Sequence, residues 1–259
     1  MTNMTPTDDK RLDGQVAIVT GASSGLGRAV ALAVAQAGAE VALVARSRPD
    51  LEAVAQQIED YAQRTLVLPV DLAAGEQIQA GVEQVIGTLG RIDLLVNAAG
   101  TDVPGPIEEL AIEGWDRVLD VNLRAPFLLA KAVFPHMRQH GGTIINISSV
   151  AGKRGWANAA AYVSAKFGLT GLTQVLNAEG KPYGIRATVL YPGAMATNWG
   201  AWTPQTRHER AEDVPEVPPP AEALPASEVA KLILWIATAP AEVVLNEAIV
   251  TPRQESAWP

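Results

Sequence analysis

The stretch QVAIVTGASSGLGRAV, from Gln15 to Val30, joins a short apolar run to a glycine-rich turn and then to a helical pattern. In such a turn, Gly21 permits the tight bend, Gly25 lets the main chain approach a pyrophosphate, and Gly27 lets the helix pack closely on the strand. The helix N-terminus then faces the negative charge. The stretch therefore predicts a strand, a phosphate-binding loop and a helix at the start of an α/β sheet.

Residues 21–25, GASSG, also fit the G-x-S-x-G nucleophile elbow of serine hydrolases. Those enzymes place the nucleophile several strands into the sheet and the histidine in a loop after the last strand. Here the motif follows the first predicted strand, and no histidine follows the last one. The order favours the cofactor loop, in which Ser23 and Ser24 donate hydrogen bonds to phosphate or cap the helix.

Seven short runs rich in Val, Ile and Leu alternate with helix-length segments along the chain. The runs cover residues 15–21, 40–46, 65–71, 92–100, 142–149, 184–193 and 243–250. Continuous apolar runs of this length are typical of strands that are buried on both faces. They predict an α/β chain with one Rossmann-type domain over residues 1–259, in which helices cover both faces of a doubly wound, seven-stranded, mostly parallel sheet. A polar N-terminal extension covers residues 1–13, and the proline-rich residues 214–225 predict an irregular segment.

Composition excludes several classes of function. The net charge of −8 argues against a nucleic-acid partner, and no apolar run reaches the length of a membrane span. The polar N-terminus has no export signal, so we expect a cytoplasmic protein. The chain has no cysteine, and His136, His140 and His208 form no H-E-x-x-H motif, so we predict no metal site.

Tyr162 and Lys166 are four residues apart in a helical segment, so their side chains project from one face. A free phenol ionises near pH ~10, and a neighbouring ammonium would move its pKa towards neutral pH. The pair could therefore form a proton-transfer site, although the same spacing in isolation is more often a pair on a helix surface.

Six motifs occur in a fixed order, namely TGASSGLG (20–27), NAAG (97–100), DVNL (120–123), NISSVAG (146–152), YVSAK (162–166) and YPGAMAT (191–197). In order and spacing the chain resembles the short-chain dehydrogenase/reductase family, from about Gly14 to Pro252. The resemblance implies an NAD(P)-dependent oxidoreductase that acts on a carbonyl or alcohol substrate. It also implies a homotetramer or homodimer built through the helices that carry DVNL and YVSAK.

The resemblance also assigns catalytic roles. Tyr162 would be the acid–base, Lys166 its partner, Ser149 the group that holds the substrate oxygen, and Asn122 the residue that kinks its helix and completes a proton relay. Ser148 is the neighbouring alternative, but the family spacing between serine and tyrosine favours Ser149.

The segment after the second predicted strand indicates the cofactor. Ala45 stands where relatives that use NAD carry an aspartate, and Arg46 follows it, so we predict NADP(H) rather than NAD(H). The cofactor-binding residues expected from the motifs, besides Tyr162 and Lys166, are Gly21, Ser23, Ser24, Gly25, Leu26, Gly27, Arg46, Asp71, Leu72, Asn97, Gly100, Pro192, Gly193, Met195 and Thr197.

The substrate stays open at this stage. A substrate loop is expected at about residues 194–225, where Trp199 and Trp202 could line an apolar pocket or pack against a neighbouring helix or subunit. Arg154 could bind a substrate carboxylate or be an exposed loop cation. The alternative function is a nucleotide-binding redox sensor or scaffold without catalysis on the same fold.

Overall fold

The protein is described by a computed structural model, which covers residues 11–61, 63–197 and 223–254 of the 259. Its centre is a seven-stranded sheet in the order β3-β2-β1-β4-β5-β6-β9, and every pairing in it is parallel. The strands are β1 (Val16–Thr20), β2 (Glu40–Ala45), β3 (Thr65–Pro69), β4 (Leu94–Asn97), β5 (Gly142–Ile147), β6 (Ile185–Pro192) and β9 (Glu247–Val250).

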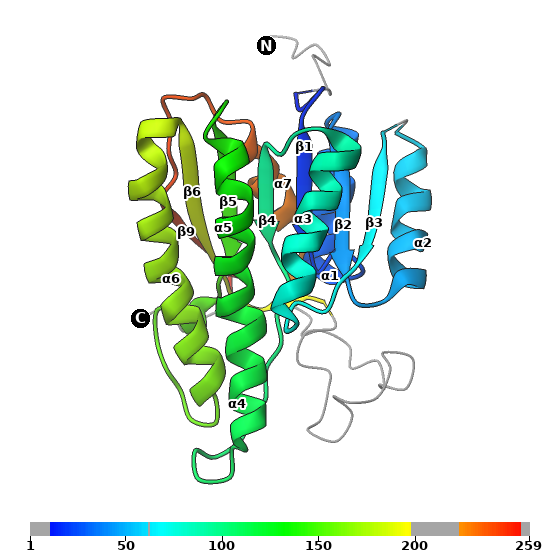
Figure 1. Ribbon diagram of the computed structural model, residues 1–259. Coiled ribbons are helices and arrows are strands. Elements are labelled where there is room, and N and C mark those ends of the chain that lie inside the picture. The colour runs from blue at the N-terminus through cyan, green and yellow to red at the C-terminus, as the bar shows by residue number, and fades with distance from the viewer. Residues whose placement is uncertain (1–10, 62, 198–222, 255–259) are drawn as a thin grey trace.

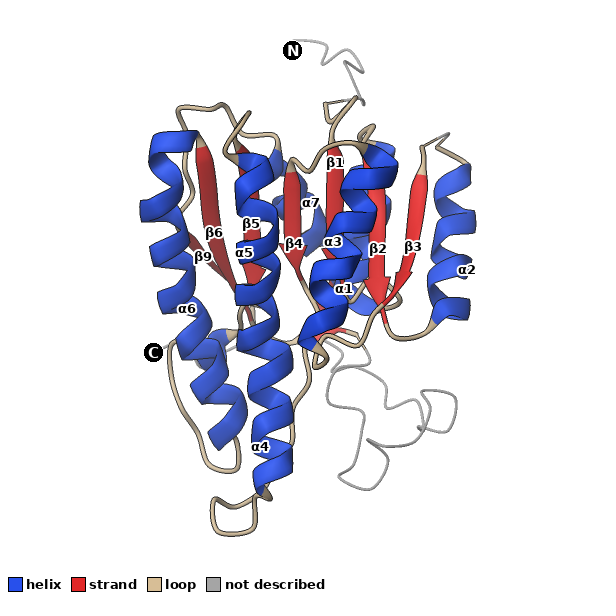
Figure 2. Ribbon diagram, viewed as in Figure 1, coloured by secondary structure: helices blue, strands red, loops and turns tan. Residues whose placement is uncertain are grey.

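Helices cover both faces of the sheet (Figures 1 and 2). They are α1 (Gly25–Gln36), α2 (Arg48–Glu59), α3 (Gly75–Leu89), α4 (Ile112–Leu119), α5 (Ala125–Met137), α6 (Ala160–Gly180) and α7 (Ala226–Ala237). Apolar side chains of α1, α2 and α7 form one core against the sheet, and those of α3, α5 and α6 form the other. The predicted α/β fold with a doubly wound sheet is therefore confirmed.

The local sequence explains where several elements begin and end. Ser47 accepts a hydrogen bond from the Asp50 amide and so caps α2, which has Pro49 in its first turn. Gly27 lies so close to the preceding turn that a Cβ there would overlap the Gly21 carbonyl oxygen. The sequence between β1 and α1 thus needs glycine for its packing.

A short strand pair and a π-helical turn were not expected from the sequence. The proline-rich segment was predicted to exclude a sheet, but Leu224–Pro225 forms β8 and pairs in parallel with β7 (Met195–Ala196). Proline is tolerated there because the ladder is only two residues long and the Leu224 amide donates to Ala194. Between α4 and α5 the chain forms one turn of π-helix, η1 (Asp120–Arg124), which interrupts an otherwise continuous helix.

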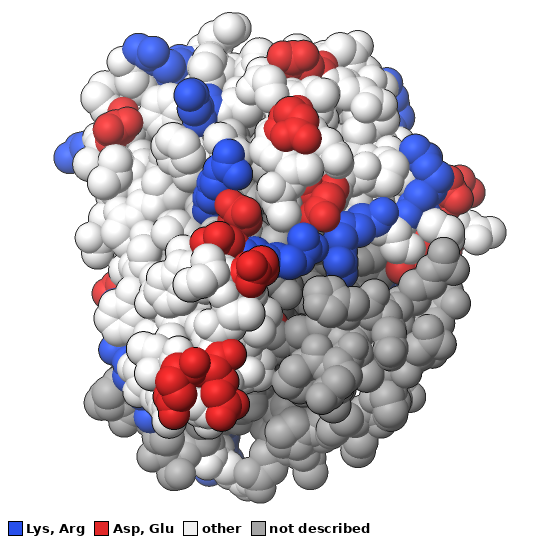
Figure 3. Space-filling view, turned by 60° about the horizontal axis from the view of Figure 1, so that its bottom comes forward, with Lys and Arg blue, Asp and Glu red and all other residues white. Residues whose placement is uncertain are grey.

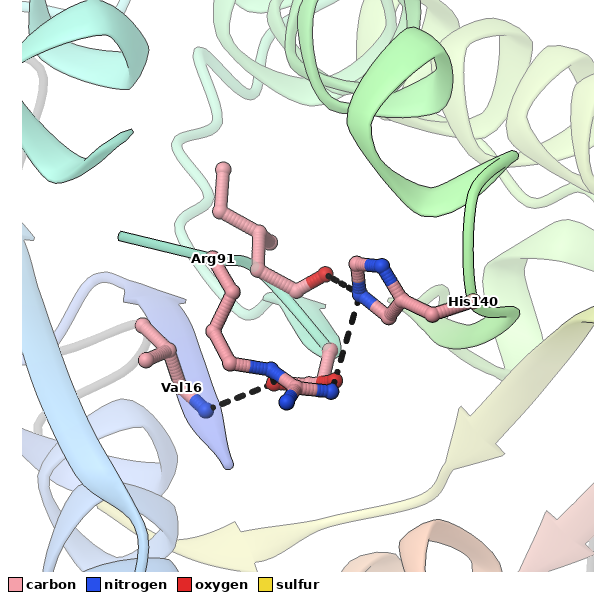
Figure 4. A network of polar contacts seen from close by, with 5 residues as sticks. Val16, Arg91 and His140 are labelled. Carbon is pink, nitrogen blue, oxygen red and sulfur yellow. Dashed lines mark hydrogen bonds and ion pairs between the residues drawn. The ribbon is translucent and has the colours of Figure 1, made fainter. Parts of the chain in front are cut away.

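A polar cluster around Asp93 joins the amino ends of β1 and β4 (Figure 4). One carboxylate oxygen, Oδ2, accepts from the Val16 amide at 2.9 Å and from Arg91 Nε at 2.8 Å. The other oxygen, Oδ1, lies 2.6 Å from Arg91 Nη2 and 3.3 Å from His140 Nε2. The cluster joins the start of β1 to β4 at the end of the sheet opposite the predicted site. None of the helices in the described part of the chain is both long and apolar enough to cross a membrane.

Candidate active site

Loops at the carboxyl ends of β1, β4, β5 and β6 meet at one edge of the sheet, at the bottom of Figure 1. The chain crosses from β3 on one side of β1 to β4 on its other side, so the loops after β1 and β4 diverge there. Such a reversal of strand order creates the crevice in which open α/β sheets bind ligands. The Thr20 hydroxyl joins these two loops by accepting from the amides of Ala98 and Ala99. We had not predicted this role of Thr20.

Tyr162 and Lys166 lie one turn apart on α6, and both are buried. The Lys166 Nζ atom is 5.5 Å from the centre of the Tyr162 ring and donates a 2.8 Å hydrogen bond to the Ile147 carbonyl at the end of β5. The spacing in sequence thus brings the two side chains together, and the strand fixes the ammonium group beside the ring rather than on the surface.

Burial dominates the ionisation of both groups. It raises the pKa of Tyr162 above that of a free phenol, a hydrogen bond with Ser149 opposes the rise, and the Asp102 carboxylate adds to it. Burial lowers the pKa of Lys166 to about 7. The pKa of Tyr162 is therefore raised rather than lowered, because desolvation outweighs the hydrogen bond with Ser149.

The two serines after β5 have different partners. Ser149 shares a hydrogen bond with Tyr162, and its Oγ atom also accepts from the Ala151 amide at 3.2 Å. Ser148 is buried and its hydroxyl donates to the Lys166 carbonyl at 3.3 Å. The structure therefore brings Ser149, and not Ser148, to the tyrosine.

Asn122 lies at the centre of the π turn and is buried. Its Nδ2 atom donates to the carbonyls of Thr101 at 2.7 Å and Val118 at 2.9 Å, and its Oδ1 atom accepts from the Thr101 amide at 3.3 Å. The side chain thus joins the π turn to the loop that follows β4. In this structure its amide contacts backbone groups rather than Lys166.

Two observations, one at the turn after β1 and one at the end of β4, fit a bound dinucleotide. The N-terminus of α1 has no side-chain cap, and the Ser24 side chain that precedes it is exposed. In the described part of the chain, the Asn97 Oδ1 atom is buried without a hydrogen-bond partner, whereas its Nδ2 atom donates to Asn146 at 2.8 Å. An exposed helix N-terminus is suited to phosphate, and an unsatisfied buried oxygen is suited to a ligand donor.

Other predicted cofactor residues surround this turn. Ser23 is half-buried, Leu26 is buried in the core, and Gly100 is exposed just after β4. A Cβ at Gly25 would meet only the Thr197 side chain, at 3.4 Å, so the loops after β1 and β6 approach each other here.

After β6, the predicted residues continue along the same edge of the sheet. Pro192 is buried, and the Gly193 amide donates to the Val250 carbonyl at 2.8 Å, which anchors this loop to β9. Met195 begins β7 and accepts from the Thr197 amide at 2.8 Å. Trp199, Trp202, Arg207 and His208, which we had placed in the substrate loop, lie outside the described residues.

The segments after β2 and β3 carry the residues expected at the adenosine end. Arg46 is exposed and makes no hydrogen bond or ion pair with any described residue, whereas Arg48 pairs with Glu52 at 3.5 Å. Asp71 lies 3.5 Å from Arg117 of α4, a contact that we had not predicted, and the Leu72 side chain is buried in the core. Figure 3 shows a row of Lys and Arg side chains beside acidic ones on this side of the molecule.

Arg154 follows the serine turn and is half-buried. Its guanidinium lies 6.0 Å from the ring of Trp156, and its Nε atom is buried without a hydrogen-bond partner among the described residues. It is therefore not simply the exposed loop cation that the sequence allowed. Among the described residues, no group of three or more His, Asp or Glu side chains could hold a metal ion.

Comparisons with known proteins agree with this geometry. Residues 15–207 match the family model described as short chain dehydrogenase. The D-threitol dehydrogenase of Mycolicibacterium smegmatis is 39% identical over 197 residues, which are 75% of this chain and 76% of that protein.

Solved structures of oxidoreductases also match this chain over nearly its whole length. A metagenomic short-chain oxidoreductase in complex with NADP is 33% identical with a TM-score of 0.80, and the match covers 93% of this chain and 99% of that one. The carveol dehydrogenase from Mycobacterium avium in complex with NAD is 26% identical with a TM-score of 0.83, over 94% of this chain and 98% of that one.

Proposed function

Because the chain belongs to the short-chain dehydrogenase/reductase family of NAD(P)-dependent oxidoreductases, we propose that it transfers hydride between NADP(H) and a carbonyl or secondary alcohol, with Tyr162 as the acid–base. The observation that carries this proposal is the convergence of the half-buried Ser149 with the buried Tyr162 and Lys166. The nicotinamide cofactor supplies or accepts the hydride when bound. The chain holds the substrate oxygen and moves the proton.

The proton step follows from the local contacts. A substrate carbonyl oxygen placed between the Ser149 and Tyr162 hydroxyls would receive two hydrogen bonds, which polarise the carbonyl and fix its orientation. Since burial raises the pKa of Tyr162, the phenol holds its proton at neutral pH and can donate it as the alcohol forms. Lys166 would then stabilise the phenolate that is left whenever it carries its proton, which its pKa of about 7 allows up to neutral pH.

The preference for NADP(H) is supported by the adenosine end of the site. Arg46 has no partner among the described residues, so its guanidinium is available for a 2′-phosphate, and Ala45 offers no carboxylate to a ribose hydroxyl. Solved relatives include complexes with either cofactor, so the preference rests on these residues of the chain itself.

We also propose that the chain is one domain in which residues 194–225 form the substrate loop. The parallel pairing of Met195 with Leu224 and of Ala196 with Pro225 brings the two ends of this segment together at the edge of the site. Exposed apolar side chains on the helices that carry DVNL and YVSAK support a homodimer or homotetramer, among them Phe127 at 47% exposure and Phe167 at 45%.

The test is Tyr162→Phe, which removes the hydroxyl and keeps the ring. We expect turnover of a carbonyl panel with NADPH to fall at least about a hundredfold, since general acid–base catalysis contributes about 10²–10⁴, while NADPH binding stays unchanged. Tyr183→Phe is the matched control, because Tyr183 is partly exposed and contacts Arg138 at the opposite end of the sheet. A parent protein that binds NADPH but reduces no member of the panel would support the non-catalytic sensor instead.

A further inference from the structure

A polar network connects the last strand of the sheet to the candidate active site. Glu247 is the first residue of β9, and its Oε2 atom lies 2.6 Å from Lys153 Nζ and 3.0 Å from the Tyr191 hydroxyl. The Lys153 ammonium also lies 4.4 Å from the centre of the Tyr191 ring. One carboxylate oxygen therefore holds two side chains from two different segments.

The first of these segments is the turn that positions Ser149. Residues 150–152 form a single 3₁₀ turn, η2, with Ser149 before it and Lys153 after it. Inside the turn the Gly152 amide donates to the Ser149 carbonyl at 2.8 Å, and the Ala151 amide donates to the Ser149 Oγ atom at 3.2 Å. Because Lys153 closes this turn, its contact with Glu247 restrains the backbone that orients the serine hydroxyl.

The second segment leads to Lys166. Tyr191 of β6 is fully buried, and its hydroxyl lies 3.2 Å from the Thr170 hydroxyl. Thr170 follows Lys166 by one turn of α6, and its Oγ1 atom lies 3.1 Å from the Lys166 carbonyl. Tyr191 has one proton to donate, and a carboxylate is the stronger acceptor, so we assign that proton to Glu247. The Thr170 hydroxyl then donates its proton either to the Tyr191 hydroxyl or to the Lys166 carbonyl.

Close packing joins the two segments. A Cβ at Gly152 would overlap Ser148 Oγ and would lie 3.0 Å from the Lys166 carbonyl oxygen and 3.2 Å from the Tyr191 ring. No space is left between the turn from Ser149 to Lys153 (the serine turn), the turn of α6 from Lys166 to Thr170 (the lysine turn) and the Tyr191 ring. In a core packed this closely, a displacement of one group shifts its neighbours.

We propose that Glu247 is a positioning residue of the active site, which fixes the serine turn through Lys153 and the lysine turn through Tyr191 and Thr170. The inference rests on the proposed roles of Ser149 and Lys166. An ion pair as exposed as this one contributes little to stability. Its effect lies in placement, because a shift of about 1 Å at a reacting centre can cost about a hundredfold in rate.

The experiment measures kcat, KM for NADPH, KM for one carbonyl substrate and Tm in the full chain. Glu247→Ala is expected to lower kcat about tenfold or more, with both KM values within about twofold of the parent. The matched control is Glu40→Ala, which removes a 3.4 Å pair with Arg64 at the amino end of the sheet. We expect it to leave kcat unchanged and to shift Tm by an amount similar to Glu247→Ala.

Two further variants separate placement from simple destabilisation. Glu247→Gln keeps an acceptor for the Tyr191 hydroxyl and should recover part of the lost kcat. The exchange Lys153→Glu with Glu247→Lys restores the ion pair in reverse and should recover more activity than either single change. A kcat for Glu247→Ala equal to that of the parent would overturn the inference, and so would a loss of kcat that neither variant relieves.

Tyr162→Phe, measured in the same series, separates this inference from the proposed function. If Tyr162→Phe is inactive and Glu247→Ala is fully active, only the positioning role is refuted. If Tyr162→Phe keeps full activity, the proposed acid–base function is itself refuted.

Discussion

Burial of Lys166 makes a quantitative prediction for stability as a function of pH. In the folded protein the pKa of Lys166 is lowered to about 7 from 10.5, so between these values the unfolded chain binds a proton that the folded chain has released. The free energy of unfolding therefore rises with pH in this window. From pH 7 to pH 9 the two pKa values give a gain of about 2 kcal/mol for this one group.

The comparison that isolates this effect is the parent against Lys166→Met. Methionine is unbranched and close in length, and it carries no charge, so every other titrating residue is common to both proteins. Urea unfolding at pH 7, 8 and 9 should show the parent gaining about 2 kcal/mol relative to the variant, at one fixed protomer concentration. Parallel stability curves for the two proteins would refute the reasoning, since they would mean that Lys166 keeps the same charge in the folded and unfolded states.

Two further predictions concern opposite ends of the sheet. Arg46→Asp should weaken NADPH binding at least about tenfold, because it removes a charge-assisted contact, and should leave NADH binding within about twofold; nicotinamide fluorescence titration measures both, with Arg64→Asp as the distant control. Asp93→Ala should lower the free energy of unfolding by about 1–3 kcal/mol, since it leaves the buried Val16 amide unsatisfied. Urea unfolding tests the second prediction, and a loss below about 0.5 kcal/mol, the range of ordinary surface substitutions, would contradict it.

The fold could be predicted because its causes are local. The seven apolar runs became the seven strands of one sheet, and Gly27 marked a place where only a glycine packs. The strand pairing β7–β8 was missed because two residues carry no periodicity and Pro225 argues against a strand. What decides that pairing is a tertiary contact, the hydrogen bond from Leu224 to Ala194.

The proximity of Tyr162 and Lys166 was predictable from the sequence, but their electrostatics were not. The interval from Tyr162 to Lys166 indicates that they share a helix face, yet it does not say how deeply that face is buried, and burial decides the direction of both pKa shifts. The contact of Glu247 with Lys153 was equally hidden, because the two residues lie 94 positions apart in the chain. No local pattern connects positions that far apart.

The hydrogen bond from Val16 to Asp93 joins residues 77 positions apart. It lies where β4 pairs with the side of β1 that is not paired with β2. During folding, β1 can pair with β2 early, but its other edge stays unpaired until two more strand–helix units have formed. Long-range parallel pairing of this kind is slow, and an open central edge is a template for pairing with another chain. We therefore expect β1, the central strand that precedes the glycine-rich turn, to be open to misassembly in a newly made chain until β4 pairs with it.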